Sequence, residues 1–266
     1  MNPLAIAIIL GIVQGVTEFL PISSSGHLVL LQHFLPVDGD DLAFDLVLHL
    51  GTLVPVIVIF WDDLIKMITD PLQGEGPFLE RPGTRWLMWV IVASIPTAIM
   101  GLALEKLFES LLSGYLSLAW QFAITAVALQ TTAKATPGQR GVEDMTWKDA
   151  LIIGIAQGIA VVPAISRSGS TIVAAILLGM RRDVAGRFSF VISVPAILGA
   201  VILKARKVTY DPELFPAWVL GGLTALVFGW ISLKFLVQVI RGGNFAKFSW
   251  YCWGAAAVSL AFGLFL

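Results

Sequence analysis

The first polar cluster of this chain combines a carboxylate, hydroxyl groups and an imidazole within fourteen residues. Gln14 and Glu18 are four positions apart, so they would lie on one face of a helix. Pro21 follows that helix, and Ser24 and its neighbours then precede His27. A carboxylate and an imidazole near hydroxyl groups are candidates for general acid–base or nucleophilic catalysis. The competing interpretation is structural, with serines that only cap a helix and a histidine that is satisfied in the core.

The second polar cluster spans residues 166–171 and contains a permanent cation. Arg167 is the only Lys or Arg between Asp149 and Met180. A guanidinium group fits phosphate oxygens, and the N–H groups at a helix start also bind anions. We therefore predict that Arg167 binds an anion. The alternative is an intramembrane ion pair with Glu18, and the two interpretations are compatible in an empty site.

The composition of the 266 residues predicts a membrane protein. Hydrophobic residues make up 57% and charged residues 13%, with a mean hydropathy of +0.86, whereas soluble domains carry about 25% charged residues. The net charge of −1 gives no basic field, so we predict no nucleic-acid partner. Cys252 is the single cysteine, which excludes an intrachain disulfide and favours a packing role. The first residues lack the basic segment of a cleavable signal, and we expect them in the mature structure.

Apolar segments of roughly 20 residues can span a hydrocarbon core of about 30 Å. Two apolar stretches, residues 3–35 and 148–181, are interrupted by Pro, Gly and Ser, and each is predicted to form a helix, a loop and a shorter helix. The predicted fold is an all-α polytopic membrane protein with six transmembrane helices and two re-entrant helical hairpins. The six spans cover residues 42–61, 86–104, 112–133, 184–203, 214–238 and 246–266.

The two interrupted stretches resemble each other at a fixed offset of 143 residues, with identity at nine of the eighteen positions from 9 to 26. We interpret this as an internal duplication in a single integral membrane domain, 1–266, with repeats over about 1–135 and 148–266. Paired broken segments indicate a site at the interface of an inverted-topology repeat. Glycines four residues apart, Gly11 with Gly15 and Gly154 with Gly158, favour close helix packing.

The differences between the repeats divide the chemistry between them. Glu18 aligns with Val161 and His27 with Ser170, so the acid–base groups belong to the first repeat. The cation Arg167 belongs to the second repeat alone. We infer a catalytic half and an anion-binding half. Two Ser-rich helix N-termini that meet near the membrane midplane would bind a doubly anionic group, such as a phosphate or diphosphate.

The positive charges predict the orientation in the membrane. If both hairpins are re-entrant and all six spans cross, twelve Lys and Arg lie on one face and four on the other. The positive-inside rule makes the twelve-charge face cytoplasmic. Both termini and the first hairpin would then lie on the outer side. Each repeat would have an odd number of crossings, so the second repeat would be inverted and its hairpin would enter from the cytoplasm.

The two clusters resemble the signatures of one known family. Residues 14–27, QGVTEFLPISSSGH, are similar to the (E/Q)xxxE and PxSSxGH motifs of the bacitracin-resistance type undecaprenyl-diphosphate phosphatases. Residues 163–171, PAISRSGST, resemble the family's PGxSRSxxT motif, with Ala164 in place of its glycine. That departure would alter the turn slightly and touches no reactive group. The order of the motifs and the chain length also agree, so the resemblance covers essentially the whole chain.

The resemblance implies a hydrolase of the bacterial inner membrane. It would remove the terminal phosphate of undecaprenyl diphosphate at the outer face and so recycle the lipid carrier for peptidoglycan synthesis, which confers bacitracin resistance. It implies Glu18, Ser24, His27 and Arg167 as the catalytic residues. Around them we predict a substrate-binding set that consists of Gln14, Ser23, Ser25, Ser166, Ser168 and Thr171.

The resemblance also implies a divalent cation, Mg²⁺ or Ca²⁺, for which Glu18 is the predicted ligand. Arg167 would hold the diphosphate while Ser24, or else Ser23, attacks. His27 would act as the base or as the acid for the leaving group, and Glu18 would orient His27 or hold the metal. Attack by His27 itself or by water stays open.

The competing function is transport. Paired broken hairpins in inverted repeats are typical of transporters, so a lipid flippase or anion transporter without hydrolysis is the alternative. A membrane scaffold without a site is disfavoured, because Arg167 and Glu18 would be isolated charges at membrane depth. The sequence leaves the oligomeric state open, including a homodimer.

Overall fold

The computed structural model describes residues 2–32, 35, 42–73, 76–111, 114–208 and 211–265, without the side chains of residues 32 and 104–111. This part of the chain is helical and contains no strand, apart from an isolated bridge between Arg140 and Met180. The helices of the first half are α1 (Pro3–Phe19), α2 (Ser24–Gln32), α3 (Leu42–Ile59), α4 (Trp61–Gln73), η1 (Phe78–Glu80), α5 (Pro82–Leu111) and α6 (Tyr115–Thr131). Those of the second half are α7 (Trp147–Ile159), α8 (Arg167–Leu177), α9 (Arg182–Ala205), α10 (Phe215–Arg241), η2 (Phe245–Lys247) and α11 (Phe248–Phe265).

Five segments of the described chain are long and apolar enough to cross a membrane. They are Leu42–Ile59, Pro82–Ala103, Arg182–Ala205, Phe215–Arg241 and Phe245–Phe265. The sixth predicted span contains α6, a helix of 17 residues that is not one of these five segments. Residues 112 and 113 of that predicted span lie outside the described residues. The all-α polytopic membrane fold is therefore confirmed, while the number of six spans stays a prediction.

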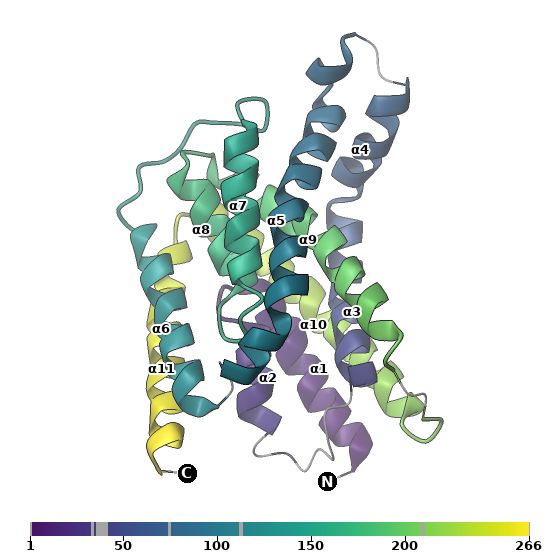
Figure 1. The fold of residues 1–266 in the computed structure, drawn as a ribbon, viewed down its shortest axis with the longest axis vertical. Coiled ribbons are helices and arrows are strands. Elements are labelled where there is room, and N and C mark those ends of the chain that lie inside the picture. The colour runs from purple at the N-terminus through teal and green to yellow at the C-terminus, as the bar shows by residue number, and fades with distance from the viewer. Residues whose placement is uncertain are drawn as a thin grey trace.

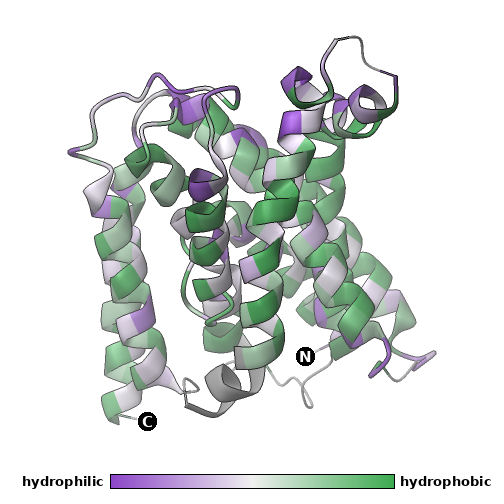
Figure 2. Ribbon diagram, turned by 45° about the horizontal axis from the view of Figure 1, so that its top comes forward, coloured by the Kyte–Doolittle hydropathy of each residue, from purple (hydrophilic) through white to green (hydrophobic). Residues whose placement is uncertain are grey.

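The surface of the bundle is apolar, as expected for helices that face lipid. Figure 2 shows hydrophobic colouring along most of the helices, with the hydrophilic positions gathered mainly at the connections. Helix α10 illustrates the pattern, because one face carries large apolar residues that are exposed and the opposite face has many small residues that are buried. The exposed residues repeat every four positions: Val219, Leu223, Val227, Ile231 and Phe235. The buried face of α10 includes Gly221, Gly222, Ala225, Gly229 and Ser232.

Both interrupted stretches form the predicted helix, loop and shorter helix. Helices α1 and α2 lie in the lower half of Figure 1, near both chain termini, and α7 and α8 lie in the upper half. Helix α2 begins at Ser24, directly after Ser23, whose hydroxyl accepts a hydrogen bond from the N–H of Gly26 and so caps the helix start. Ser166 caps α8 in the same way, through the N–H of Gly169.

The glycines of α1 and α7 permit close helix packing, which confirms the interpretation of their spacing. Helix α1 packs along α10, and α7 packs along α5. A Cβ atom at Gly11 would lie 2.6 Å from the carbonyl oxygen of Gly221, and one at Gly154 would lie 2.2 Å from that of Ala93. Each interrupted stretch therefore presses its leading helix against a long helix of the other half of the chain.

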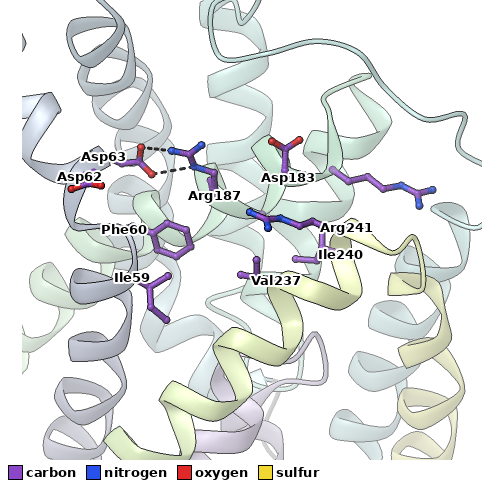
Figure 3. Close-up of a pocket in the computed structure, with 11 residues that line it drawn as sticks. Ile59, Phe60, Asp62, Asp63, Asp183, Arg187, Val237, Ile240 and Arg241 are labelled. Carbon is purple, nitrogen blue, oxygen red and sulfur yellow. Dashed lines mark hydrogen bonds and ion pairs between the residues drawn. The ribbon is translucent and has the colours of Figure 1, made fainter.

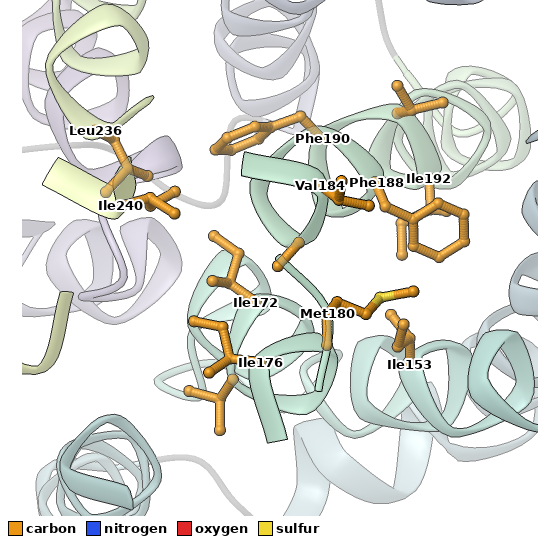
Figure 4. Packing of buried hydrophobic residues seen from close by; sticks show 14 of the residues in the cluster. Ile153, Ile172, Ile176, Met180, Val184, Phe188, Phe190, Ile192, Leu236 and Ile240 are labelled. Carbon is orange, nitrogen blue, oxygen red and sulfur yellow. The ribbon is translucent and has the colours of Figure 1, made fainter. Parts of the chain in front are cut away.

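The main hydrophobic core includes side chains of α7 and α8, the helices of the second interrupted stretch, together with side chains of α9 and α10 (Figure 4). Ile172 and Ile176 of α8 point toward α9 and α10, and Phe188 and Ile192 of α9 pack near Ile153 of α7. All five side chains are buried, at 4% exposure or less. This packing fixes α8, and with it the helix start that carries Arg167, against the rest of the bundle.

Candidate active site

Glu18 is the centre of a buried polar cluster between the two interrupted stretches. Its Oε2 atom accepts hydrogen bonds from the hydroxyl of Ser24 at 2.6 Å and from the amide of Gln14 at 3.1 Å. Its Oε1 atom pairs with Nη2 of Arg167 at 2.5 Å. The structure thus brings together four of the predicted site residues, two from α1, one from α2 and one from α8. The Glu18 side chain is 7% exposed, so these hydrogen bonds replace the water that the carboxylate loses.

Two atoms of this cluster have no hydrogen-bond partner among the described residues. They are Nη1 of Arg167 and Oε1 of Gln14, and both are buried. Ser24 and Arg167 are also the first residues of α2 and α8, where backbone N–H groups lack partners inside the helix. A buried guanidinium N–H beside two helix starts matches an anion that carries several oxygens.

The remaining serines of the two loops bind the opposite loop. The hydroxyls of Ser23 and Ser25 donate to the carbonyl oxygen of Pro163, at 3.0 and 2.8 Å. At the positions offset by 143 residues, the Ser168 hydroxyl donates to the carbonyl oxygen of Leu20 at 3.3 Å. In this resting structure these hydroxyls therefore hold the two loops together, and their predicted contact with substrate stays untested.

Ser23 and Thr171 also have structural positions. Ser23 is the one described residue other than glycine with a positive φ, 66°, which is a strained left-handed conformation. This turn directs the following residues into α2. The Thr171 hydroxyl donates to the carbonyl oxygen of Arg167 at 2.9 Å and also contacts the hydroxyl of Ser189 in α9. Ser166 caps α8 and contacts Ser168 at 3.3 Å.

His27 makes its hydrogen bonds with Ser23 and Tyr251. Its Nδ1 atom is 2.6 Å from the carbonyl oxygen of Ser23, and its Nε2 atom is 2.7 Å from the hydroxyl of Tyr251. Its ring also packs edge-on against Phe122 at a centroid distance of 5.5 Å. The hydroxyl of Ser24 donates to Glu18, so Glu18 rather than His27 is the carboxylate or imidazole base that contacts Ser24.

Tyr251 is the site residue that the sequence did not indicate. It lies 224 residues after His27, in an apolar helix without any motif that could associate it with the site. One signal was present: Tyr251 is one of only three tyrosines in the chain. The neighbouring Cys252 is buried, and its thiol lies 3.5 Å from the carbonyl oxygen of Pro21, in line with the predicted packing role.

An apolar groove begins beside His27. It has a volume of about 440 Å³ and lies between α1, α2 and α11. Tyr251 and His27 form its polar part. Its apolar lining consists of Ile12, Val13, Val16, Leu30, Leu31, Val258 and Phe262, together with Thr17.

A second pocket lies where α4, α9 and α10 meet, away from Glu18 (Figure 3). Arg187 of α9 points toward Asp63 of α4 and donates two hydrogen bonds to its carboxylate, at 2.5 and 3.1 Å. The two charges neutralise each other, and the pocket contains none of the predicted site residues. This ion pair therefore joins two helices and is not a second reaction centre.

The described residues contain no group of three or more His, Cys, Asp or Glu side chains that could hold a metal ion. The side chains of the cluster that could supply oxygen ligands are Glu18, through its carboxylate, and Gln14, whose amide nitrogen donates to Glu18 and whose amide oxygen has no partner. Mg²⁺ often takes one or two protein oxygens and completes its coordination with phosphate oxygens and water. The two side chains fit a cation that binds together with an anionic substrate.

The fold and the site define a class: an α-helical polytopic membrane protein with a buried carboxylate, hydroxyl and guanidinium cluster between two helix starts. A model of the family described as bacitracin resistance protein BacA matches residues 7–258. The chain belongs to this family, as the two sequence signatures implied.

Relatives with high similarity span nearly the same length. The undecaprenyl-diphosphatase of Methanosphaera stadtmanae is 41% identical over 257 residues, which cover 92% of this chain and 93% of that protein. That of Moorella thermoacetica is 42% identical over 245 residues, 92% of both chains. That of Desulfosudis oleivorans is 41% identical over 278 residues, 99% of this chain and 100% of that protein.

Proposed function

We propose that this chain is an undecaprenyl-diphosphate phosphatase, which hydrolyses undecaprenyl diphosphate to undecaprenyl phosphate and inorganic phosphate. The observation that carries the proposal is the buried Glu18 carboxylate, hydrogen-bonded to the Ser24 hydroxyl and paired with Arg167, whose Nη1 atom has no partner. A hydroxyl next to a base is the arrangement of an activated nucleophile, and a guanidinium group stabilises a transferring phosphoryl group. The family and the names of the relatives agree with this activity.

The first step would transfer the terminal phosphoryl group to Ser24. The Oγ atom of Ser24 forms a bond to the terminal phosphorus while its proton passes to Oε2 of Glu18, 2.6 Å away. The bond from that phosphorus to the bridging oxygen breaks, and undecaprenyl phosphate leaves. Arg167 and the first N–H groups of α2 and α8 stabilise the charge on the equatorial oxygens.

The second step would release the phosphate with water. The water oxygen forms a bond to the phosphorus of phosphorylated Ser24, and the water proton passes to Nε2 of His27. The bond from phosphorus to Ser24 Oγ breaks, and Glu18 returns its proton to that oxygen. His27 then loses its proton to solvent. Nε2 is the ring atom for this role, because Nδ1 is held by the Ser23 carbonyl.

The apolar groove beside His27 would hold the polyprenyl chain. His27 borders this groove, which is lined mostly by aliphatic side chains. A lipid tail placed there would direct its diphosphate toward the starts of α2 and α8. The lipid therefore supplies binding energy away from the reacting phosphorus, which contributes to the positioning of that group.

A divalent cation would be held by Glu18 and by the free amide oxygen of Gln14, together with the diphosphate. When bound, it supplies positive charge next to the phosphate oxygens. Substrate oxygens and water would complete its coordination, which agrees with the small number of protein ligands in this region.

For the membrane, we propose an inverted-topology repeat with both termini and the site on the outer side. The positive charges support this orientation. The opposite placement of α1–α2 and α7–α8 in Figure 1 supports two re-entrant hairpins that enter from opposite sides. An outer opening would give the enzyme the diphosphate lipid that is left after cell-wall polymerisation.

The deciding experiment is a measurement of inorganic phosphate released from undecaprenyl diphosphate by the purified protein in detergent. Wild type should release phosphate, and Glu18→Ala should lose most of the rate while it keeps the melting temperature expected of a folded bundle. A folded wild-type protein without phosphate release would reject the proposal and favour transport.

A further inference from the structure

Tyr251 of α11 contacts the imidazole of His27. Its hydroxyl lies 2.7 Å from Nε2 of His27, and the two rings are stacked at a centroid distance of 5.5 Å and an angle of 21°. Both residues also line the apolar groove. The ring stacking and the hydroxyl contact are separate interactions, so they can be removed separately.

The two contacts of His27 determine where its proton lies. The backbone carbonyl of Ser23 is only an acceptor, so Nδ1 of His27 must carry a hydrogen and donate it. In the neutral ring Nε2 is then an acceptor, and the Tyr251 hydroxyl is the donor. The two hydrogen bonds together select one tautomer and one ring orientation.

We propose that Tyr251 is a positioning residue for the hydrolysis. Its hydroxyl donates to Nε2 of His27 at the mouth of the groove and so keeps that atom as a hydrogen-bond acceptor. The water that cleaves the phosphoenzyme then replaces the tyrosine hydroxyl at Nε2. This inference rests on the proposed function. The water would occupy the position of the tyrosine hydroxyl and donate its proton to the same lone pair. Tyr251 touches His27 rather than the reacting phosphorus, so it acts through His27.

The location of Tyr251 agrees with this role. Its side chain is 50% exposed and borders the groove, so the hydroxyl can move away without disrupting the core. His27 is held on its other edge by Ser23 and Phe122, and its ring would keep its orientation when the tyrosine hydroxyl moves. A purely structural tyrosine would instead be buried, with its hydroxyl bonded to a main-chain group.

The test is Tyr251→Phe, which keeps the stacked ring and removes the hydroxyl. Tyr115→Phe is the matched control, because Tyr115 lies on α6, does not line the groove and keeps its ring against Phe262 in this variant. We expect Tyr251→Phe to lower kcat about 5- to 10-fold with KM within about two-fold, the size of effect of one hydrogen bond. We expect Tyr115→Phe to match wild type in both parameters.

A spectroscopic measurement separates positioning from a loss of folding. With ¹⁵N-labelled histidine, wild type should show His27 as the neutral tautomer with its hydrogen on Nδ1, and the signal is assigned by its loss in His27→Gln. In Tyr251→Phe the Nε2 resonance should shift, because its hydrogen-bond donor is gone. In Tyr115→Phe the Nε2 resonance of His27 should stay at its wild-type position.

Three results would overturn the inference. One is an active wild type whose kcat, KM and His27 resonances are all unchanged by Tyr251→Phe. Another is a loss of rate with unchanged His27 resonances and a lower melting temperature, which is the pattern of a structural role. The third is a hydrogen on Nε2 in wild type. A silent wild type would reject the proposed function instead, and the resonances would still test the hydrogen bond.

Discussion

Glu18 has two hydrogen-bonded sides in the resting site, and each has a different consequence for the reaction. On one side Ser24 donates its hydroxyl hydrogen to the carboxylate, and on the other Arg167 compensates the negative charge. An incoming phosphate would compete with Glu18 for the guanidinium group, whose Nη1 atom is still without a partner. Substrate binding would then weaken the Glu18–Arg167 pair and make the carboxylate a stronger base toward Ser24.

The proposed roles of Glu18 and His27 predict that a phosphoserine at Ser24 can be detected. His27→Gln should slow the water step more than the transfer step, because Glu18, not His27, contacts the Ser24 hydroxyl. The substrate is labelled with ³²P in its terminal phosphate. We expect the labelled phosphoryl group to remain bound to the His27→Gln protein. The label should be absent when Ser24→Ala is added. Equal labelling of the double variant would place the nucleophile elsewhere.

At the scale of helices, the site depends on how closely each leading helix approaches its long partner. Gly154 lies against the main chain at Ala93, where a side chain has no space. By contrast, a Cβ atom at Gly101 would have its nearest neighbour 4.0 Å away, at a methyl group of Val161. The two positions lie on α7 and α5, which pack together, so they form a matched pair.

Gly154→Ala should destabilise the protein by about 1–3 kcal/mol, because the added methyl group forces the α5 backbone away. Gly101→Ala should be neutral or stabilising by up to about 1 kcal/mol, because alanine favours the helix. Thermal unfolding of the two variants in one detergent compares them. A lower melting temperature for Gly101→Ala than for Gly154→Ala would contradict the close packing.

The start of α7 carries a pH-dependent contribution to stability. Asp149 is buried, which raises its pKa, but the hydrogen bonds from Arg140 and from Thr146 outweigh this and leave the pKa below the ordinary value of 3.8. A lowered native pKa stabilises the fold above the ordinary value, and this contribution is lost as the pH falls through the native pKa. Thr146 also caps α7, so the hydrogen bonds between Thr146 and Asp149 stabilise the start of the second hairpin.

Asp149→Asn should therefore lower the melting temperature at neutral pH, and its effect should shrink as the pH falls through the native pKa of Asp149, which lies below 3.8, because the wild-type carboxyl is then protonated as well. Asp62→Asn, at an exposed position of α4, is the control. Melting curves from pH 7 downward test this. A difference between wild type and Asp149→Asn that stays constant at all pH values would show that the charge of Asp149 contributes nothing.

For the whole molecule, the sequence predicted which residues form the site better than it predicted the hydrogen bonds that join the two loops around the site. The grouping of Gln14, Glu18, Ser24 and Arg167 followed from the motifs and the duplicated pattern. The pairing of Ser25 with the Pro163 carbonyl did not, because a serine hydroxyl can donate to any nearby carbonyl oxygen and only the folded chain selects one. Tyr251 was missed for a similar reason: one aromatic residue in an apolar helix has no periodic signal.

The proposed orientation can be measured on the intact protein, because its single cysteine is buried. Single cysteines at Asn2, Glu213 and Gln139 should give different reactions with a membrane-impermeant maleimide in whole cells. We expect Asn2→Cys and Glu213→Cys to react, since they lie on the proposed outer side, and Gln139→Cys to react only after permeabilisation. The reverse labelling pattern would contradict the proposed orientation and show that the site faces the cytoplasm. Wild type controls for labelling of Cys252.

The crossed hydrogen bonds between the two loops set the order in which the enzyme becomes competent during its synthesis. Ser25 can form its hydrogen bond only after Pro163 has been synthesised, and the Leu20 carbonyl only after Ser168, because each partner belongs to the second half of the chain. A nascent chain that has reached residue 150 already holds Glu18, Ser24 and His27, yet it lacks Arg167 and the acceptor for its own first loop. We therefore expect Glu18, Ser24 and His27 to support hydrolysis only after the second half of the chain has entered the membrane.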